Sequence, residues 1–240
     1  MIPILMYHSI QRVSRKEIMR SIHVSPLSFK IQMFLIKLLG YRGCSVTEAI
    51  DALKTDTDRD EKLIALTFDD GYRNFVTNAL PTLERYGFSA TIYIVSDLIG
   101  DSNRWDEKTG ISKNDLMSAD EVKLCITKGI EIGCHSATHP KLTDHKVDLE
   151  RELLTSKRNL EKTLAITINA FCYPYGIYDD TIKQLLHQCG YSSATTMKRG
   201  RASASDNAFE LPRIPITWHT LPHLFILKII SAYEDRRRHN

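Results

Sequence analysis

The sequence predicts an α/β fold in which short buried strands alternate with longer amphipathic helices in a single domain. Short apolar runs recur along the chain, helix-like patterns separate them, and glycines end several of these patterns. The 240 residues lie within the size of one domain, and no repeat, low-complexity segment or Gly/Ser/Pro linker divides them. Because strands that alternate with helices form parallel sheets, we expect about seven parallel strands with helices outside them.

The predicted strands are short apolar or β-branched runs, as is typical of strands that are buried on both faces. In chain order they cover residues 2–7, 63–68, 89–95, 130–134, 170–173, 191–196 and 213–217.

The predicted helices carry apolar residues at helical spacing and begin or end at recognisable signals. Ser118 and Glu121 have the spacing of a capping box, and Gly129 follows as a stop. Pro81 must kink its helix or lie near a helix start, and Pro222 fits a first turn. The helices cover residues 28–39, 74–86, 119–128, 149–164, 179–189 and 220–233, with long loops at 97–118 and 198–212.

Composition and charge exclude several classes of protein. A net charge of +3 and a pI near 8.5 are too mild for a nucleic-acid-binding protein, and the arginines at 236–238 form an isolated basic run. We therefore expect a catalytic domain at 1–235, a basic flexible tail at 236–240 and no nucleic-acid partner. The five cysteines form no CxxC pair, which favours reduced thiols over disulfides or a thiolate zinc site.

The sequence indicates no membrane-spanning segment. The opening apolar run is short and has no positively charged region before it, unlike a signal peptide, and no run of about 18 apolar residues occurs. We therefore expect a cytoplasmic protein without membrane contact. The alternative is that the helix at 220–233 lies on a membrane surface instead of covering the sheet.

Two carboxylates follow the strand predicted at 63–68. Asp69 and Asp70 come directly after it, and Gly71 permits a sharp turn. An ordinary Asp-Gly turn that caps the next helix is the simpler interpretation. Two acids beside a buried strand are costly, however, unless a partner or a metal offsets their charge.

Two histidines follow the strand predicted at 130–134. His135 and His139 are four residues apart, which brings their rings together if the segment makes one helical turn. Neutral imidazoles are ligands that zinc and related transition metals prefer. Two unrelated loop histidines are the alternative. Cys134 points to the opposite face of the strand from His135, so we expect it to be a buried thiol.

Two further polar groups lie at the same predicted edge of the sheet, where parallel α/β folds carry their chemistry. His8 ends the first strand, and the turn at 173–176 could present backbone N–H groups to a developing oxyanion. One carboxylate and two histidines would leave open positions on a metal, as in catalytic zinc sites. The second carboxylate could then take a proton from a water on that metal.

Three motifs, taken in order, resemble the polysaccharide deacetylases of carbohydrate esterase family four: TFDDG at 67–71, HSATH at 135–139 and YPYG at 173–176. The resemblance extends over about residues 4–215. It implies a distorted (β/α) barrel with fewer than eight regular strands. It also implies a hydrolase that removes N-acetyl groups from amino sugars, so an N-acetylated glycan is the expected partner.

The resemblance further implies roles for individual residues. Asp70, His135 and His139 would bind a divalent metal, with zinc expected first and cobalt, nickel and iron as alternatives. Asp69 would act as the general base. The backbone at Tyr175 would stabilise the oxyanion alongside the metal.

The sequence departs from the family pattern in two places. The arginine that usually stands two residues before the proline of the third motif is Cys172 here, so our hypothesis is that Arg213 orients Asp69 instead. The usual late leucine-and-histidine motif is absent. The opening LMYHSI resembles the permuted branch of poly-N-acetylglucosamine deacetylases, which implies that His8 is the general acid that protonates the leaving amine.

Aromatic residues near the motifs are candidates for contacts with sugar rings. We assign Tyr72, Tyr173 and Trp218 to substrate binding, and Trp105 is a weaker candidate because large aromatics more often anchor loops. Two other functions stay open at this point. The protein could hydrolyse another non-peptide C–N bond, such as a cyclic amide, or it could bind a glycan without catalysis.

Overall fold

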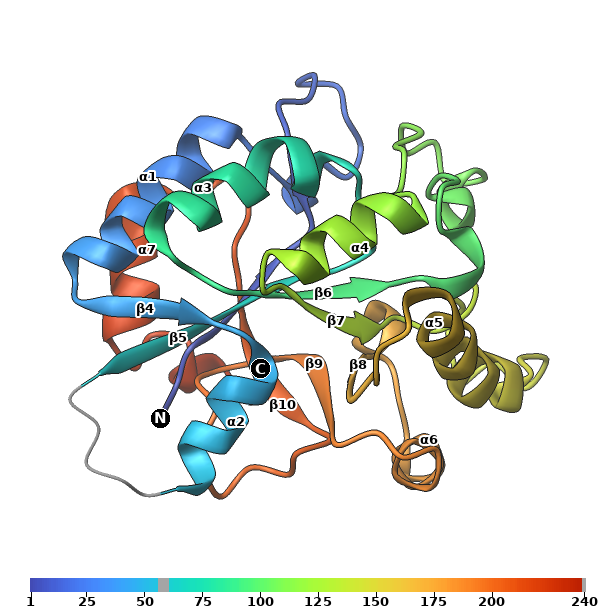
Figure 1. Cartoon of the computed structure of the whole chain (residues 1–240). Coiled ribbons are helices and arrows are strands. Elements are labelled where there is room, and N and C mark those ends of the chain that lie inside the picture. Colours follow the sequence, from blue (N-terminus) through green and yellow to red (C-terminus); the bar gives the residue numbers. More distant parts are fainter. Residues whose placement is uncertain (56–60, 239–240) are drawn as a thin grey trace.

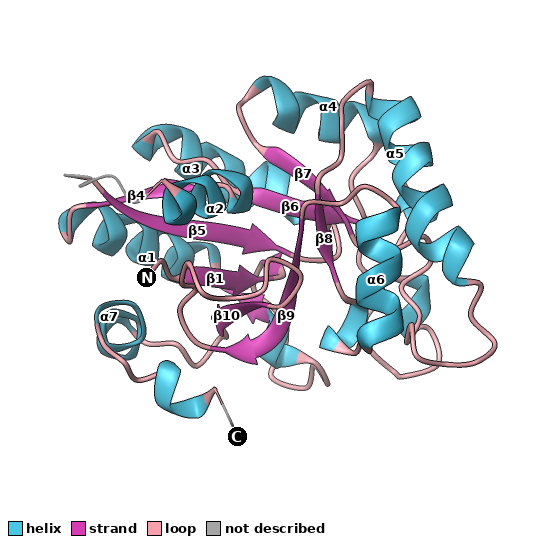
Figure 2. Ribbon diagram, turned by 90° about the horizontal axis from the view of Figure 1, so that it is seen from below, coloured by secondary structure: helices cyan, strands magenta, loops and turns pink. Residues whose placement is uncertain are grey.

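A computed structural model describes residues 1–55 and 61–238. Its centre is a closed ring of parallel strands, in which β1 pairs with β10 on one side and with β5 on the other (Figures 1 and 2). The strands of the ring, in chain order, are β1 (Ile4–Tyr7), β5 (Lys62–Phe68), β6 (Thr91–Ile94), β7 (Glu131–Cys134), β8 (Ala170–Cys172), β9 (Ser193–Arg199) and β10 (Leu211–Pro215). The predicted distorted (β/α) barrel with about seven parallel strands in one domain is therefore confirmed.

Three short strands lie outside this ring. β4 (Tyr41–Cys44) pairs with the first half of β5. It lies on the same edge of β5 as β6, which pairs with the second half. β2 (Ser9–Ile10) and β3 (His23–Val24) form a separate parallel pair next to the end of β1.

Helices cover the outside of the barrel, as Figure 2 shows in cyan. Two of them continue π-helical segments, at Phe75–Ala79 before α3 and at Glu150–Thr155 before α5. The helices are α1 (Pro26–Leu38), α2 (Val46–Lys54), α3 (Leu80–Tyr86), α4 (Ala119–Thr127), α5 (Ser156–Leu164), α6 (Asp180–Gln188) and α7 (Pro222–Ile230).

Aromatic packing fixes the carboxyl ends of β1 and β5. The ring of Tyr7 stacks on Phe68 with centroids 5.3 Å apart, and Phe29 of α1 packs edge-on against both rings. Buried aromatic pairs of this kind stabilise a fold beyond the area that they bury. Because His8 follows Tyr7 and Asp69 follows Phe68, this packing fixes the backbone positions from which both side chains extend.

The helix signals in the sequence are largely confirmed. Ser118 and Glu121 form both bonds of a capping box at the start of α4. Pro81 lies in the first turn of α3, and Gly87 ends this helix in the left-handed conformation. α7 ends at Ile230 rather than at residue 233 as predicted.

The sequence did not predict β4 and α2. β4 reads Tyr-Arg-Gly-Cys, which lacks the apolar alternation of a strand. Its glycine is required by close packing, since a Cβ on Gly43 would lie 2.7 Å from Cγ of Phe88. The strand pattern is therefore interrupted by a glycine that is needed for packing against Phe88.

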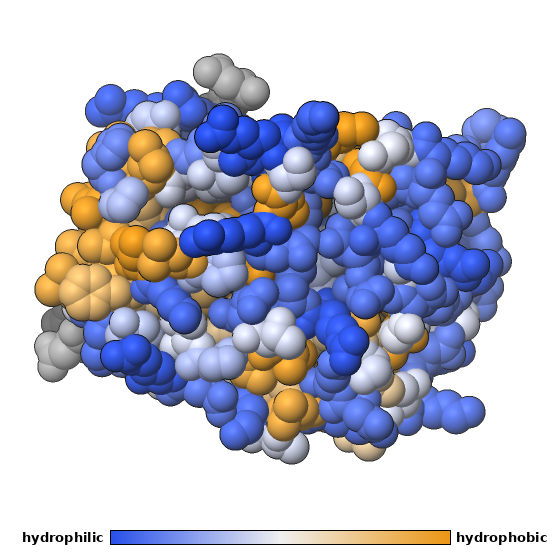
Figure 3. Space-filling view, turned by 90° about the horizontal axis from the view of Figure 1, so that it is seen from above, coloured by the Kyte–Doolittle hydropathy of each residue, from blue (hydrophilic) through white to orange (hydrophobic). Residues whose placement is uncertain are grey.

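Hydrophobic side chains also reach the surface. Figure 3 shows them gathered at one edge of the molecule, on the side where α1 and α7 lie. α7 buries Phe225 and Ile229 in the main core and exposes Leu227 and Ile230. Among the described residues, no helix has the length and apolar character needed to cross a membrane.

A short 3₁₀ helix, Asp235–Arg237, overlaps the start of the segment 236–240 that was predicted to be a flexible tail. Arg238 forms an ion pair with Asp206. Residues 239–240 lie outside the described residues.

Candidate active site

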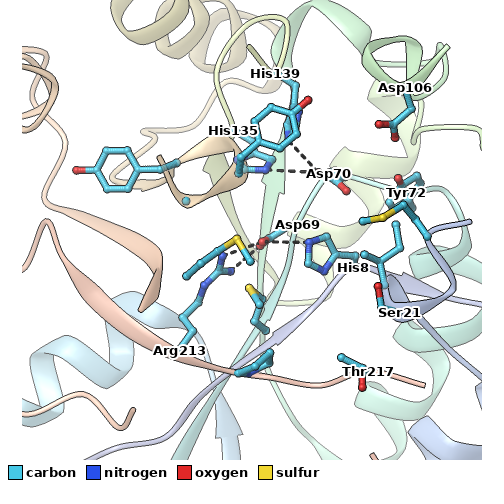
Figure 4. A pocket seen from close by; sticks show the side chains of 18 of the residues that line it. His8, Ser21, Asp69, Asp70, Tyr72, Asp106, His135, His139, Arg213 and Thr217 are labelled. Carbon is cyan, nitrogen blue, oxygen red and sulfur yellow. Dashed lines mark hydrogen bonds and ion pairs between the residues drawn. The ribbon is translucent and has the colours of Figure 1, made fainter. Parts of the chain in front are cut away.

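The carboxyl ends of the barrel strands surround a cavity of about 450 Å³. Its lining includes polar side chains that follow β1, β5 and β7, together with one that comes from β10 (Figure 4). This is the edge at which parallel barrels carry their chemistry, so the structure brings the predicted motifs to one place.

Asp70, His135 and His139 converge on one point of this cavity. Oδ1 of Asp70 lies 3.4 Å from Nε2 of His135 and 3.4 Å from Nε2 of His139. All three side chains are buried, and their ligand atoms lie within 4.8 Å of one another. Two imidazole nitrogens and a carboxylate oxygen at this spacing are a donor set that a divalent transition metal accepts.

The hydrogen bond of His135 determines which of its two ring nitrogens can bind a metal. Its Nδ1 lies 2.7 Å from the carbonyl oxygen of Cys172. Because a carbonyl can only accept, Nδ1 carries a proton, so Nε2, which faces Asp70, is the nitrogen that can bind a metal in place of a proton. Burial, with the charge of His135, lowers the pKa of His139 to about 3, so that its imidazole is neutral.

The surroundings favour a positive charge at this point. Burial opposes the charged form of Asp70, but the hydrogen bond from His135 and the nearby histidine charges hold the pKa of Asp70 below its usual range. Burial lowers the pKa of His135, but Cys172 and Asp70 more than offset it and raise that pKa well above its usual value. A proton or a metal cation between these groups offsets the buried carboxylate.

The segment from His135 to His139 is not the helical turn that the sequence left open. Ser136 and His139 adopt left-handed conformations, with φ of 66° and 61°. The buried carboxylate of Glu152 holds the segment by accepting from the N–H groups of Ala137 and Thr138 at 2.8 and 2.9 Å. Backbone strain of this kind persists only where surrounding bonds fix it. Glu152 is a supporting residue that the sequence reasoning missed.

Asp69 lies beside Asp70 but has a different partner. The guanidinium of Arg213 donates from Nη1 to Oδ1 at 2.7 Å and from Nη2 to Oδ2 at 2.8 Å. Burial alone would raise the pKa of Asp69, but the charge and hydrogen bonds of Arg213 lower it below its usual range. The carboxylate is therefore ionised over a wide range of pH.

Further contacts hold Arg213 inside the barrel. It donates from Nε to the carbonyl oxygen of Thr196 at 2.9 Å and from Nη1 to Oγ1 of Thr67 at 3.1 Å. Nη2 also lies 3.2 Å from Sγ of Cys172. The register of β10 against β9 shifts between Leu211 and Arg213, and such irregularities re-aim a side chain.

A second group of possible ligands is formed by Asp69, His135 and Cys172. Both oxygens of Asp69 already accept from Arg213, and Sγ of Cys172 lies against the same guanidinium. A cation there would meet the positive charge of Arg213. The group with Asp70 and His139 is therefore the better candidate for a metal.

His8 lies on the other side of Asp69 (Figure 4). Its Nε2 is 3.7 Å from Oδ2 of Asp69, which is the distance of an ion pair rather than of a hydrogen bond. The side chain is 21% exposed and lines the cavity. It is therefore open to solvent and within reach of a molecule in the cavity.

The turn of the third motif places Tyr175 at the cavity. Tyr175 has φ of 58°, and Gly176 follows with φ of 66°. Among the described residues, no backbone carbonyl accepts from the N–H of Tyr175, while Gly176 donates to Tyr173. The Tyr175 ring is 42% exposed and packs edge-on against His139 at 4.6 Å, and burial raises the pKa of its hydroxyl to about 12.

The three predicted sugar-binding residues have different positions. Tyr72 and Tyr173 line the cavity, but the hydroxyl of Tyr173 donates to the carbonyl of Phe209 at 3.0 Å. Trp218 does not line it. The guanidinium of Arg20 lies over its ring, with Cζ 3.7 Å from the centroid, and Trp218 stays 40% exposed, so its contact with sugar stays a prediction.

Trp105 and Asp106 line the cavity from a short 3₁₀ helix, Arg104–Asp106. The ring of Trp105 stacks on His139 with centroids 4.6 Å apart. In the sequence Trp105 is only a weak candidate for sugar contact, and no pattern singles out Asp106. The available signal was the long loop predicted at 97–118, because long ordered loops often carry function.

Comparisons with known proteins agree with this arrangement. A family model described as polysaccharide deacetylase matches residues 56–194. YxkH of Bacillus subtilis, provisionally named a polysaccharide deacetylase, is 27% identical over 217 residues, which cover 90% of this chain and 71% of that protein. The deacetylase PplD of Streptococcus pyogenes, solved in complex with acetate, is 29% identical with a TM-score of 0.81, over 95% of this chain and 97% of that one.

A more distant relative carries a more specific name. The poly-β-1,6-N-acetyl-D-glucosamine N-deacetylase of Staphylococcus aureus is 22% identical over 174 residues, which cover 68% of this chain. This chain spans 58% of the length of that relative.

Proposed function

Because the chain belongs to the polysaccharide deacetylase family, we propose that it is a metal-dependent hydrolase that removes N-acetyl groups from amino sugars. The observation that carries the proposal is the convergence of Asp70, His135 and His139 beside a second carboxylate that is held separately. Residues 1–235 would form the catalytic domain.

The proposed metal ligands fit a divalent cation. They offer two imidazole nitrogens and one carboxylate oxygen, all within 4.8 Å of one another. Zinc is the first candidate, and cobalt, nickel and iron accept the same donors. When bound, the ion would polarise the acetyl carbonyl and make a water molecule a better nucleophile.

Asp69 is the proposed general base. A base must be ionised and within reach of the water from which it takes a proton. Arg213 keeps Asp69 ionised and fixes the plane of its carboxylate through two hydrogen bonds. Arg213 is therefore a positioning residue in this proposal, and it supplies the contact that the family arginine would make from the position of Cys172.

His8 is the proposed general acid, and the N–H of Tyr175 is the proposed oxyanion donor. His8 lies across Asp69 from Arg213 and lines the cavity, so it is the proposed donor of a proton to the leaving amine. An amine is a poor leaving group unless it receives a proton. The N–H of Tyr175 would offset the negative charge that develops on the acetyl oxygen.

The proposed substrate is an N-acetylated glycan, either a polymer or a biosynthetic precursor. The relatives named as polysaccharide deacetylases, and the Staphylococcus aureus relative named for poly-N-acetylglucosamine, support this class. The cavity of about 450 Å³ has the size of a site for one small ligand unit.

The test is acetate release from N-acetylated glucosamine oligomers and from poly-β-1,6-N-acetylglucosamine. The protein should release acetate when supplied with a divalent cation, and the Asp69→Asn variant should not. Binding of the oligomers without acetate release under any metal would instead indicate a glycan-binding module. Turnover of cyclic ureides in place of glycans would assign it to another C–N hydrolase.

A further inference from the structure

The carboxylate of Asp106 is buried in the wall of the cavity and has no cationic partner. Asp106 is 8% exposed and ends the short helix Arg104–Asp106. Its Oδ2 accepts a hydrogen bond from Nδ2 of Asn103 at 3.1 Å, and the side chain of Trp105 is a further donor beside the carboxylate. Within the described part of the chain, no Lys, Arg or His forms an ion pair with it. Figure 4 shows it across the cavity from Asp69 and Arg213.

A carboxylate in this position lacks the opposite charge that burial normally requires. Burying a charge is costly unless hydrogen bonds and an opposite charge compensate for it. Arg213 is the guanidinium that lines the cavity, and both of its terminal nitrogens donate to Asp69. Burial, with the charge of Asp70, raises the pKa of Asp106 above its usual value. A molecule in the cavity can supply the missing donors.

The loop that carries Asp106 is held in place independently of its carboxylate. Trp105 stacks on His139, and Oδ1 of Asn103 accepts from the N–H of Asn114 at 2.7 Å. The N–H of Asp106 donates to the carbonyl of Asn103, and its carbonyl accepts from Oγ1 of Thr109. The carboxylate is therefore presented by a fixed backbone, as a recognition residue requires.

We propose that Asp106 is a specificity-determining residue that accepts a hydrogen bond from a hydroxyl or ammonium group of the amino sugar. This proposal rests on the proposed deacetylase function and assigns its sugar selectivity. Hydrogen bonds to a charged acceptor contribute more than neutral ones, and a site built around such a bond rejects molecules that cannot form it. The cavity should thus discriminate between N-acetylated sugars and simple acetyl compounds.

The test compares two substrates in the metal-loaded protein. Glucosamine oligomers that are fully N-acetylated can donate to Asp106, whereas 4-nitrophenyl acetate has no donor group. The variants are Asp106→Ala and the isosteric Asp106→Asn, which keeps the volume and the bond to Asn103 if the first folds poorly. The matched control is Asp101→Ala, because Asp101 lies on the same loop, 39% exposed, and pairs with Arg104.

The measured quantity is the ratio of kcat/KM for the oligomer to kcat/KM for the aryl acetate. We expect the Asp106 variants to lower this ratio by about 10-fold or more, as the loss of one hydrogen bond to a charged group does. The Asp101 control should leave it unchanged. An unchanged ratio in both Asp106 variants would overturn the proposal, as would equal losses on the two substrates.

A third substrate separates the two donor groups. If the Asp106 variants lose more kcat/KM on partly deacetylated oligomers than on fully acetylated ones, the donor is an ammonium group. Equal losses of kcat/KM on the two kinds of oligomer identify a hydroxyl. If the wild-type protein hydrolyses the aryl acetate and releases no acetate from any oligomer, the proposed function fails and this inference fails with it.

Discussion

Arg213 and Asp69 form a doubly hydrogen-bonded ion pair inside the barrel, although 144 residues separate them in the sequence. Both side chains are almost fully buried, at 1% and 3% exposed. Asp69 follows β5 and Arg213 comes from β10, and both of these strands pair with β1. Closure of the barrel therefore brings the two residues together, and Arg213 then fixes the orientation of the Asp69 carboxylate and favours its charged form.

Replacing Arg213 should damage turnover and shift its pH dependence. Arg213→Lys keeps a charge but loses the second hydrogen bond, so we expect kcat to fall roughly 10- to 100-fold with a smaller change in KM. Because the hydrogen bonds of Arg213 contribute, with its charge, to the low pKa of Asp69, losing one of these bonds should raise that pKa. The acidic limb of the kcat profile should then move to higher pH.

A matched control exists on the surface of the protein. Arg201 also donates two hydrogen bonds to one aspartate, Asp235, at 2.9 and 2.6 Å. Arg201→Lys should leave the rate and the pH profile unchanged. An Arg213→Lys protein with the wild-type acidic limb would show that Arg213 does not act through Asp69.

His8→Ala should affect amides more than activated esters. An amine must be protonated as it leaves, whereas 4-nitrophenolate leaves without help, so we expect kcat to fall about 10²- to 10⁴-fold for the glycan and far less for 4-nitrophenyl acetate. Metal content, measured by atomic absorption, should stay that of the wild type. The control is His219→Ala, a late histidine outside the cavity lining. Equal losses on both substrates would remove His8 from the role of acid.

Local sequence signals were sufficient for the residues that directly follow strands. Asp69, Asp70 and His135 each come after an apolar run, and the shared edge of a parallel barrel brings them together. The hypothesis that Arg213 reaches Asp69 could not come from local signals alone. It also required the comparison with the family pattern, in which an arginine stands at the position of Cys172. The structure shows the contact, and the role of the contact in catalysis stays a proposal.

Residues placed by loops could not be predicted in this way. Trp105 and Asp106 reach the cavity because Asn103 and Asn114 bond within their loop and because Ser112 bonds to Glu17 of a distant segment. No periodicity records such contacts. The indole of Trp218 likewise receives a contact that no pattern predicts, since Arg20 of the short 3₁₀ helix Arg20–Ile22 lies over its ring.

Removing a divalent cation should abolish acetate release and lower stability. Any ion that binds only the folded protein stabilises it, by about 2.7 kcal/mol at 100 times the Kd, so the Tm should rise on loading. His139→Ala should lose this rise together with one bound ion per chain. His145→Ala is the control, because that side chain is 87% exposed and close in sequence. Full activity in a chelated protein without detectable metal would refute metal dependence.

Glu152 should support metal binding without touching the metal. Its carboxylate accepts from two backbone N–H groups and from the hydroxyl of Thr138, at 2.8, 2.9 and 2.7 Å, and so fixes the segment between His135 and His139. Glu152→Ala leaves these donors without their partner. This costs about 1–3 kcal/mol for the buried N–H of Ala137 and less for the half-buried donors of Thr138, and urea unfolding measures the loss. Because supporting residues orient metal ligands, calorimetry should show metal affinity about 10- to 100-fold weaker.

Two variants serve as controls for this prediction. Glu152→Gln retains an acceptor oxygen and should recover most of the lost stability and metal affinity, whereas Glu150→Ala, at an exposed neighbour, should lower neither. Reduced stability with unchanged metal affinity would show that Glu152 holds the fold but not the site.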